Sequence, residues 1–292
     1  MATPIRLSVV IVWRDEREGI VACLHSLVKQ VEAAEGEVIV VSDKVESELI
    51  SDRDVFPHLR WLHIDPPLTE PRAWQAGLRI AQGETVAFGQ ARCRYTPGWA
   101  EAALSARMDK DHVATGPVML GQGHTLAGRA NYLCDYGAFA NPAGERSNQA
   151  PSNNIAFERR ALSALSEGQG LHKSALLRRR KFRVVWAPAM EVTIRPVRSF
   201  LSDAIARFHR GRQYAALRAR EWSWPSRIVC GVACVFLPAL LFARLLRSKY
   251  VRMEFSNTIT IGFPWIATSL ATWSFGEMIG YWTGPGVSQQ FA

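Results

Sequence analysis

Three polar side chains that could hydrogen-bond a ligand, Asp15, Asp43 and Gln90, each follow a short apolar segment of the chain. Those segments are residues 8–12, 37–41 and 85–88. Carboxylate and amide oxygens accept hydrogen bonds from N–H and O–H groups, and the guanidinium of Arg92 is suited to phosphate. These side chains can bind one anionic ligand only if the fold brings them to a common place.

The segments that carry these residues alternate with helical patterns. An amphipathic helix begins after residue 18, a further strand is expected at residues 59–64, and a helix at residues 72–82. Alternation of strand and helix at this spacing predicts a parallel sheet with crossover helices. Ligands of such sheets bind at the carboxyl ends of the strands, where Asp15, Asp43 and Gln90 fall.

The middle of the chain continues the pattern less regularly. The expected elements are a strand at 112–119, a surface loop at 141–148, helices at 158–165 and 171–180, and a strand at 182–186.

The net charge of +9 favours anionic partners, which are nucleoside diphosphates, lipid headgroups or nucleic acid. Nucleic acid is the least favoured, because aromatic residues do not alternate with the basic ones as in a stacking platform. The five cysteines are scattered, without zinc-ligand spacing, which indicates reduced thiols in a cytosolic setting. No signal-peptide pattern precedes the first strand.

The sequence changes character near residue 198. Residues 200–220 form a basic amphipathic pattern, and apolar runs follow at 228–243 and 259–279. The second run has the length of a membrane span and the first, which contains Pro238, is marginal. A spanning hairpin and a pair of interfacial helices both remain open. Glu277 lies within the second run, so a buried partner such as an arginine or a tryptophan N–H is expected for it.

Residues 86–99 read Val-Ala-Phe-Gly-Gln-Ala-Arg-Cys-Arg-Tyr-Thr-Pro-Gly-Trp. This stretch resembles the centre of the family 2 glycosyltransferases, in which an Asp-x-Asp precedes a Pro-Gly-Trp. Further resemblances follow in the family's order, at residues 8–16, 40–43, 73–77, 131–137, 153–160 and 276–281. The resemblance implies a GT-A fold, an α/β domain with a mostly parallel sheet and crossover helices, followed by amphipathic and membrane helices.

The resemblance also implies a metal site that this sequence lacks. In the family, the two aspartates hold Mg²⁺ or Mn²⁺ against the diphosphate of a nucleotide-sugar. Gln90 and Arg92 stand in their places, so we expect no metal cofactor. Arg92 and Arg94, with Arg210 and Arg212 further along, are expected to neutralise the diphosphate instead. The alternatives are a decayed site with Arg92 in solvent, and contact of Arg210 and Arg212 with lipid headgroups.

The family's general base belongs to a Gly-Glu-Asp. Direct alignment puts Gln169 and Gly170 on that acidic pair, and Glu167 or His172 could replace it if the loop shifts by two or three residues.

Other family positions suggest how donor and acceptor are held. The resemblance implies that Asp15 and Asp43 bind the donor nucleotide, and that Asp135, Asn153 and Asn154 line the acceptor side. Each aspartate also has a purely structural interpretation, because aspartates are common where helices begin and at turns.

We expect a glycosyltransferase-like protein that moves a sugar from a nucleotide-sugar to a glycan or lipid acceptor at a membrane, without metal if it is active. The alternative is an inactive pseudo-glycosyltransferase that serves as a partner in polysaccharide or glycolipid assembly. The expected parts are a GT-A domain at 1–197, an interface helix at 198–227, two membrane-associated segments at 228–286 and a tail at 287–292. The first domain is expected on the cytoplasmic side.

Overall fold

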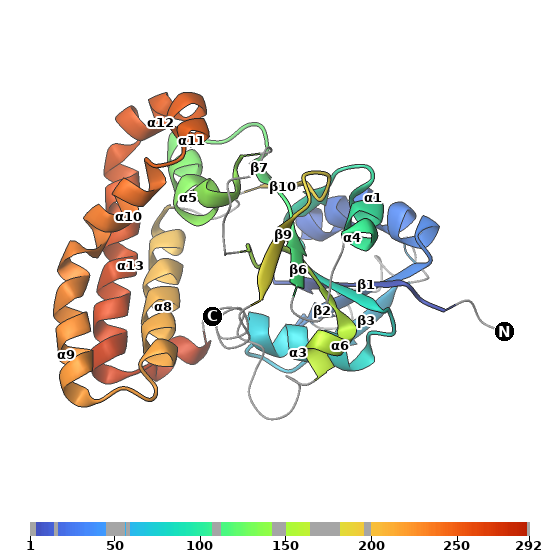
Figure 1. Ribbon diagram of the computed structural model, residues 1–292, viewed down its shortest axis with the longest axis horizontal. Coiled ribbons are helices and arrows are strands. Elements are labelled where there is room, and N and C mark those ends of the chain that lie inside the picture. Colours follow the sequence, from blue (N-terminus) through green and yellow to red (C-terminus); the bar gives the residue numbers. More distant parts are fainter. Residues whose placement is uncertain are drawn as a thin grey trace. The chain divides into compact units, whose positions relative to one another are not determined.

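A computed structural model describes residues 4–14, 17–44, 56, 59–106, 112–141, 150–163, 182–195 and 200–290. The chain divides into two compact units (Figure 1). The sheet unit consists of Met1–Met119 and Pro142–Arg195, and the helical unit of Leu120–Asn141 and Pro196–Ala292. The sequence-based division at residue 197 lies close to the second boundary. Residues 120–141, which we expected in the first domain, belong with the helical unit.

The sheet unit is built on a seven-stranded sheet in the order β3-β2-β1-β4-β8-β6-β9. Its strands are β1 (Leu7–Trp13), β2 (Gly36–Ser42), β3 (Arg60–His63), β4 (Thr85–Gln90), β6 (His112–Thr115), β8 (Asn154–Glu158) and β9 (Arg183–Trp186). All pairs are parallel except those that β8 makes with β4 and β6. The mostly parallel sheet predicted from the sequence is therefore confirmed.

A smaller three-stranded sheet lies beside the main one in the order β5-β10-β7. It consists of β5 (Cys93–Tyr95), β7 (Val118–Leu120) and β10 (Val192–Ile194). The strand expected at 112–119 is thus two short strands, β6 and β7, which belong to different sheets.

Helices cover both faces of the main sheet. They are α1 (Arg17–Ala33), α3 (Glu70–Ile80), α4 (Trp99–Ser105) and α6 (Arg159–Ser163). Figure 1 shows α1 and α4 on one face and α3 and α6 on the other. All seven residues of β1 are buried, as expected for a continuous apolar strand between two helical layers. On the α3 face, Trp74 stacks on Phe88 with ring centroids 4.4 Å apart.

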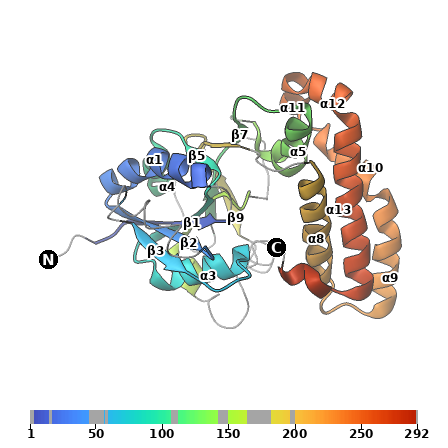
Figure 2. The same cartoon turned by 180° about the vertical axis from the view of Figure 1, so that it is seen from behind.

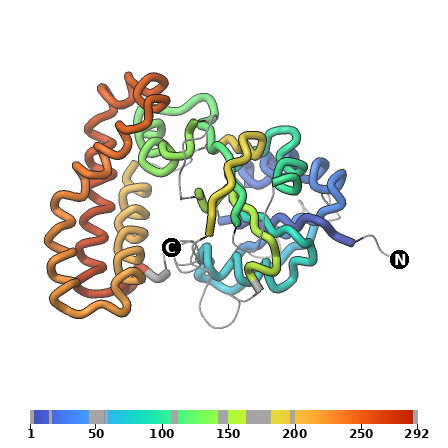
Figure 3. The backbone as a smooth tube through the Cα atoms, viewed as in Figure 1, coloured from blue at the N-terminus to red at the C-terminus, as the bar shows by residue number. Residues whose placement is uncertain are grey.

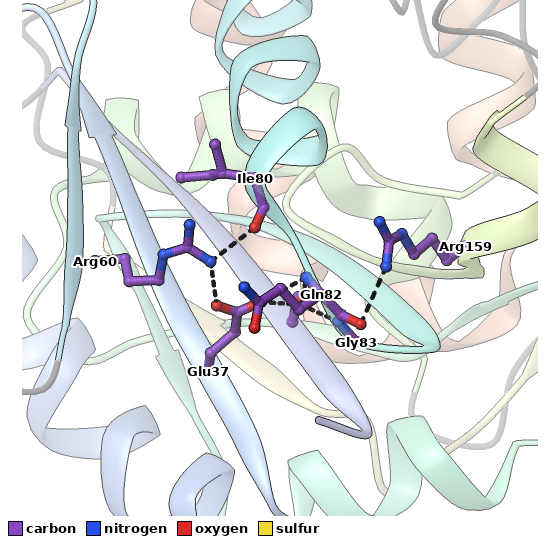
Figure 4. Close-up of polar contacts among 7 residues, drawn as sticks. Glu37, Arg60, Ile80, Gln82, Gly83 and Arg159 are labelled. Atoms are coloured by element: carbon purple, nitrogen blue, oxygen red, sulfur yellow. Dashed lines mark hydrogen bonds and ion pairs between the residues drawn. The ribbon is translucent and has the colours of Figure 1, made fainter. Parts of the chain in front are cut away.

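The amino ends of the strands are tied together by Glu37 of β2 (Figure 4). One carboxylate oxygen accepts hydrogen bonds from Ser8 Oγ and from the Gln82 backbone N–H, each at 2.7 Å. The other pairs with Arg60 Nη1 at 2.7 Å, and the same nitrogen donates to the Ile80 carbonyl. Because Ile80 and Gln82 stand at the end of α3, this network fixes the point where α3 returns to the sheet.

At the opposite end of the strands, β4 passes close to Tyr95. A Cβ atom built on Gly89 would lie 1.8 Å from Tyr95 Oη, well inside van der Waals contact. Only glycine fits there without displacing the tyrosine. Gly89 directly precedes Gln90, so this contact fixes the position of the end of β4 relative to Tyr95.

The helical unit contains ten helical segments within the described residues. They are α5 (Leu126–Tyr136), η1 (Gly137–Phe139), α8 (Phe200–Arg218), α9 (Trp224–Ala233), η2 (Cys234–Phe236), α10 (Leu237–Leu245), α11 (Lys249–Glu254), α12 (Ser256–Ile261), α13 (Phe263–Thr283) and η3 (Gly286–Gln290). The backbone tube in Figure 3 shows α8 joined by a short turn to α9, with α13 running alongside.

Glycines let the backbones of α8 and α13 come into direct contact. A Cβ on Gly276 would lie 2.2 Å from the Phe208 carbonyl oxygen, and one on Gly280 would lie 2.2 Å from that of Arg212. Small residues four apart allow such close packing of helices. The amphipathic helix expected at 200–220 is confirmed as α8, and it packs on α13 through Gly211 and Ala215.

The apolar segment that could cross a membrane is not the one we expected. In the part of the chain that the structure describes, Trp224–Leu245 alone is long and apolar enough, with a mean hydropathy of 2.3. The helical path continues past Pro238, because this proline stands in the first turn of α10, where a missing N–H costs little. In α13, serines, threonines and Glu277 lower the hydropathy, and several of them are buried within the unit. The partner expected for Glu277 is confirmed, since Trp273 Nε1 donates to its carboxylate at 2.5 Å.

We predict that Glu37→Ala destabilises the sheet unit by about 1–3 kcal/mol, because it removes the acceptor of Ser8 Oγ and of the Gln82 N–H as well as the partner of Arg60. Glu37→Gln keeps one oxygen acceptor, and the ion pair that it removes is weak because the Arg60 side chain is 38% exposed. The loss of stability in Glu37→Gln should therefore be clearly smaller than in Glu37→Ala. Thermal unfolding of the purified chain measures both, and equal stability of the alanine variant and the wild type would contradict the prediction.

We predict that Gly89→Ala destabilises the chain by about 1–3 kcal/mol, because the added methyl group overpacks against Tyr95 Oη. Tyr95→Phe removes that oxygen and should recover part of the loss in the double variant. The same melting experiment tests this, with Gly128→Ala as a control at a helix position where the nearest contact is an ordinary 3.4 Å. A double variant no more stable than Gly89→Ala alone would rule out the tyrosine contact as the cause.

Candidate functional site

The ends of β1, β2 and β4 lie side by side at the carboxyl edge of the sheet. In the strand register, Trp13 pairs with Ser42, and Val12 pairs with both Val41 and Gln90. The residues that follow these strands therefore gather at one edge, as the sequence predicted for Asp43 and Gln90. Asp15, the third residue of the expected set, lies outside the described residues.

Gln90 and Arg92 contact one another at this edge. Arg92 Nε donates to Gln90 Oε1 at 3.1 Å, and both side chains are half-buried. The turn between them is held by the Ala91 N–H on the Val12 carbonyl and by the Arg195 N–H on the Arg92 carbonyl. The guanidinium is thus held on a fixed turn, while Arg94 on β5 is exposed.

Asp43 lies at the end of β2 and contacts the backbone of Leu68. Its Oδ2 accepts from the Leu68 N–H at 3.3 Å, and Arg14 Nη1 donates to the Leu68 carbonyl at 3.0 Å. Asp43 therefore has a structural contact at this edge, and its role toward a nucleobase stays a prediction.

Two basic residues at the same edge were missed by sequence reasoning. Arg14 directly follows β1, and the Lys44 ammonium lies 5.0 Å from the centre of the Trp13 ring. Arg14 lies two residues after the expected strand at 8–12 and Lys44 directly follows Asp43, but neither has a sequence pattern that marks it as part of a site. With Arg92, they give the edge three cationic side chains.

The two asparagines expected on the acceptor side lie in the interior. Asn154 accepts from Trp99 Nε1 at 2.9 Å and donates to the carbonyls of Met190 and Pro117. Asn153 donates to Cys93 Sγ at 3.3 Å, and its oxygen is buried without a hydrogen-bond partner. Both are fully buried, so in this structure they support the loops below the edge.

Thiols and a phenol form the layer beneath the turn after β4. Burial raises the pKa of the Cys23 thiol well above its usual value, and nearby Cys93 adds to the shift. Burial likewise raises the pKa of Tyr95, with both thiols contributing. These groups stay neutral at physiological pH. All five cysteines are thiols, as the sequence indicated.

The Gln90 and Arg92 side chains, as the structure describes them, are poor ligands for a divalent cation of the Mg²⁺ or Mn²⁺ type. The Gln90 oxygen already accepts from a guanidinium, whose positive charge would repel a cation placed beside it. Across the described residues, no three histidine, cysteine, aspartate or glutamate side chains gather as a metal-binding group.

The remaining described candidates belong to the helical unit, where they join helices. Asp135 Oδ2 lies 3.0 Å from Arg207 Nη2, and its Oδ1 lies 3.5 Å from Arg210 Nη1. Arg212 donates to the Gly284 carbonyl and to Thr283 Oγ1 at the end of α13. Their expected roles toward donor and acceptor stay predictions. Glu167 and His172, the candidate bases, lie outside the described residues.

Two known structures that match the chain are a mannosyltransferase and GalNAc-T7. A mannosyltransferase, PcManGT from Pyrobaculum calidifontis, solved with GDP-Man and Mn²⁺, matches with a TM-score of 0.58 and 17% identity over 95% of this chain and 87% of its own. GalNAc-T7, solved with UDP, GalNAc and Mn²⁺, matches with a TM-score of 0.49 and 14% identity over 65% of this chain. The chain covers only 44% of the length of GalNAc-T7.

No curated protein matches the sequence. The likeness to the mannosyltransferase shows a GT-A fold, which agrees with the mostly parallel sheet and the helical C-terminal part. The family model described as "Glycosyl transferase family 2" matches residues 8–185, which is more than half of the chain. The chain belongs to glycosyl transferase family 2.

Proposed function

We propose that the sheet unit binds the nucleoside diphosphate of a sugar donor through side chains, without a resident divalent cation, and transfers the sugar to a glycan or lipid acceptor at a membrane. The observation that carries the proposal is the contact between Gln90 and Arg92 at the end of β4, which puts a guanidinium where the family has carboxylates. Family membership and the GDP-Man in the related mannosyltransferase support a nucleotide-sugar as donor.

Arg92 would take over the electrostatic role of the metal. A guanidinium is permanently charged and donates two parallel hydrogen bonds to neighbouring oxygens, which matches the geometry of a diphosphate. When the bond between the sugar C1 and the diphosphate oxygen breaks, the electron pair stays on the diphosphate. A positive charge already held at that place lowers the energy of this step. Arg94 on β5 would add a second charge.

The acceptor hydroxyl would form the new bond to C1 and lose its proton to a base. Glu167 and His172 are the candidates, and their assignment rests on the sequence alone.

The alternative is a partner protein that keeps the fold without catalysis. What favours it is that neither position 90 nor position 92 has a carboxylate, and that Gln169 and Gly170 align with the family's acidic pair. A protein of this kind would serve in polysaccharide or glycolipid assembly. It could bind a nucleotide, but it would show no sugar transfer.

We predict that Arg92→Ala raises the Kd for UDP or GDP at least tenfold, which corresponds to about 1.4 kcal/mol. The Kd of Arg92→Lys should lie between those of the wild type and Arg92→Ala, because lysine keeps the positive charge but cannot donate two parallel hydrogen bonds. Calorimetric titration of the detergent-solubilised chain measures this, with Arg183→Ala as a control at an exposed arginine of β9. An unchanged Kd in a folded Arg92→Ala variant would overturn the proposed role of Arg92.

We predict that nucleotide binding persists in excess EDTA and that Mn²⁺ changes the Kd by less than about twofold, because no cation bridges the diphosphate to the protein. The same calorimeter provides the measurement. Binding that strictly requires Mn²⁺ would show that a metal site exists. Transfer of a labelled sugar to lipid or glycan would then separate an enzyme from an inactive partner that only binds the nucleotide.

A further inference from the structure

One face of the helix formed by Trp224–Leu245 is apolar and exposed. Beyond its first turn, five apolar side chains are 53–75% accessible, and they are Val229, Val232, Val235, Phe236 and Leu240. We call these five residues the outer face. A contiguous apolar surface of this kind marks a site of interaction with a membrane or another protein. The opposite face, which includes Gly231 and Cys234, packs within the helical unit.

The charged helix α8 runs alongside α13, which lies between α8 and this segment. Near the turn that joins α8 to the segment, Ala215 and Ala219 pack in one cluster with Cys234. At the other end, Arg207 pairs with Asp135 of α5, and a Cβ on Gly137, just after α5, would lie 2.7 Å from Leu245 Cδ1. Figures 1 and 2 show α8, α13 and the Trp224–Leu245 helix side by side.

This arrangement conflicts with a membrane-spanning orientation. If Trp224–Leu245 crossed the bilayer, α8 would lie at the same depth. Its charged residues would then stand at the level of the hydrocarbon core; they are Asp203, Arg207, Arg210, Arg212 and Arg218. Only Arg207 is almost fully buried within the protein, and charged groups at that depth are costly. The helix is long enough to span, but its neighbour is too polar to accompany it.

Basic residues flank the segment at both ends. Arg220 and Arg227 stand at its start, and Arg244, Arg247 and Lys249 at its end. A spanning helix would have basic clusters on both sides of the membrane, against the usual bias toward one side. A helix that lies flat brings both clusters to the headgroups of a single leaflet, where anionic lipids attract them.

We propose that Trp224–Leu245 lies in the plane of the membrane, with its outer face in the acyl-chain boundary and both basic ends on anionic headgroups of one leaflet. The helical unit then holds the chain on one surface of the bilayer, and α8 stays in water on the far side of α13. This orientation rests on the membrane location included in the proposed function, and the partner of the outer face is a lipid surface.

We predict that both ends of the helix react from the same side of a vesicle. The full chain with Arg220→Cys and Lys249→Cys is reconstituted in vesicles and treated with a membrane-impermeant maleimide, and the labels per molecule are counted by intact mass. The wild type gives the background of its own five cysteines. A flat helix gives molecules with no added label or two, whichever way they are inserted, and detergent converts all of them to two. Molecules with a single added label would overturn the proposal.

Flotation of the wild-type chain with vesicles tests the surface itself. Phe236→Glu should reduce co-flotation with vesicles that contain anionic lipid at least fivefold, whereas Ser105→Glu adds the same charge on an exposed position of α4 and should not. Wild-type chain that does not float with any vesicle would overturn the membrane assignment. Nucleotide binding is measured separately on the same preparation, so its absence would count against the proposed function and leave this result standing.

Discussion

Parallel pairing of β1 with both β2 and β4 is the constraint on which the candidate site depends. It places the last residues of the three strands at one edge in fixed register, so that Asp43 and the Gln90–Arg92 pair belong to a single surface. The network around Glu37 holds the other end of the same strands, and the Gly89–Tyr95 contact sets the end of β4. The positions of the candidate side chains therefore follow from groups that do no chemistry themselves.

Much of the sheet unit could be predicted from the sequence, because continuous apolar segments between helical patterns have few other solutions than a parallel sheet. The site was partly predictable for the same reason. Gln90, Arg92 and Asp43 lie at the expected edge, since the end of a strand is a position that the sequence fixes well. Arg14 and Lys44 were missed because a basic residue beside a strand end has no distinguishing pattern of its own.

Other expectations were not met at positions whose environment is set by residues far away in the sequence. Asn153 and Asn154 belong to a motif resembling the acceptor side of the family, but Trp99, Pro117 and Met190 enclose Asn154, and no local pattern foretells partners so far along the chain. The preference for residues 259–279 as the membrane segment failed for a similar reason. The polar residues of α13 are sheltered within the helical unit, partly against α8, whereas the Trp224–Leu245 helix has one face left uncovered.

The approach of α8 and α13 has a mechanical consequence. Because Gly276 and Gly280 bring peptide groups of the two helices into contact, each helix has its backbone seated in a recess of the other. Sliding one helix along the other would drive carbonyl oxygens into Cα atoms, which cannot yield as a flexible side chain can. The two helices should therefore move as one rigid body, and the ion pair between Asp135 and Arg207 links α5 to them. A displacement at one end of α8 or α13 would therefore displace the other end of both helices.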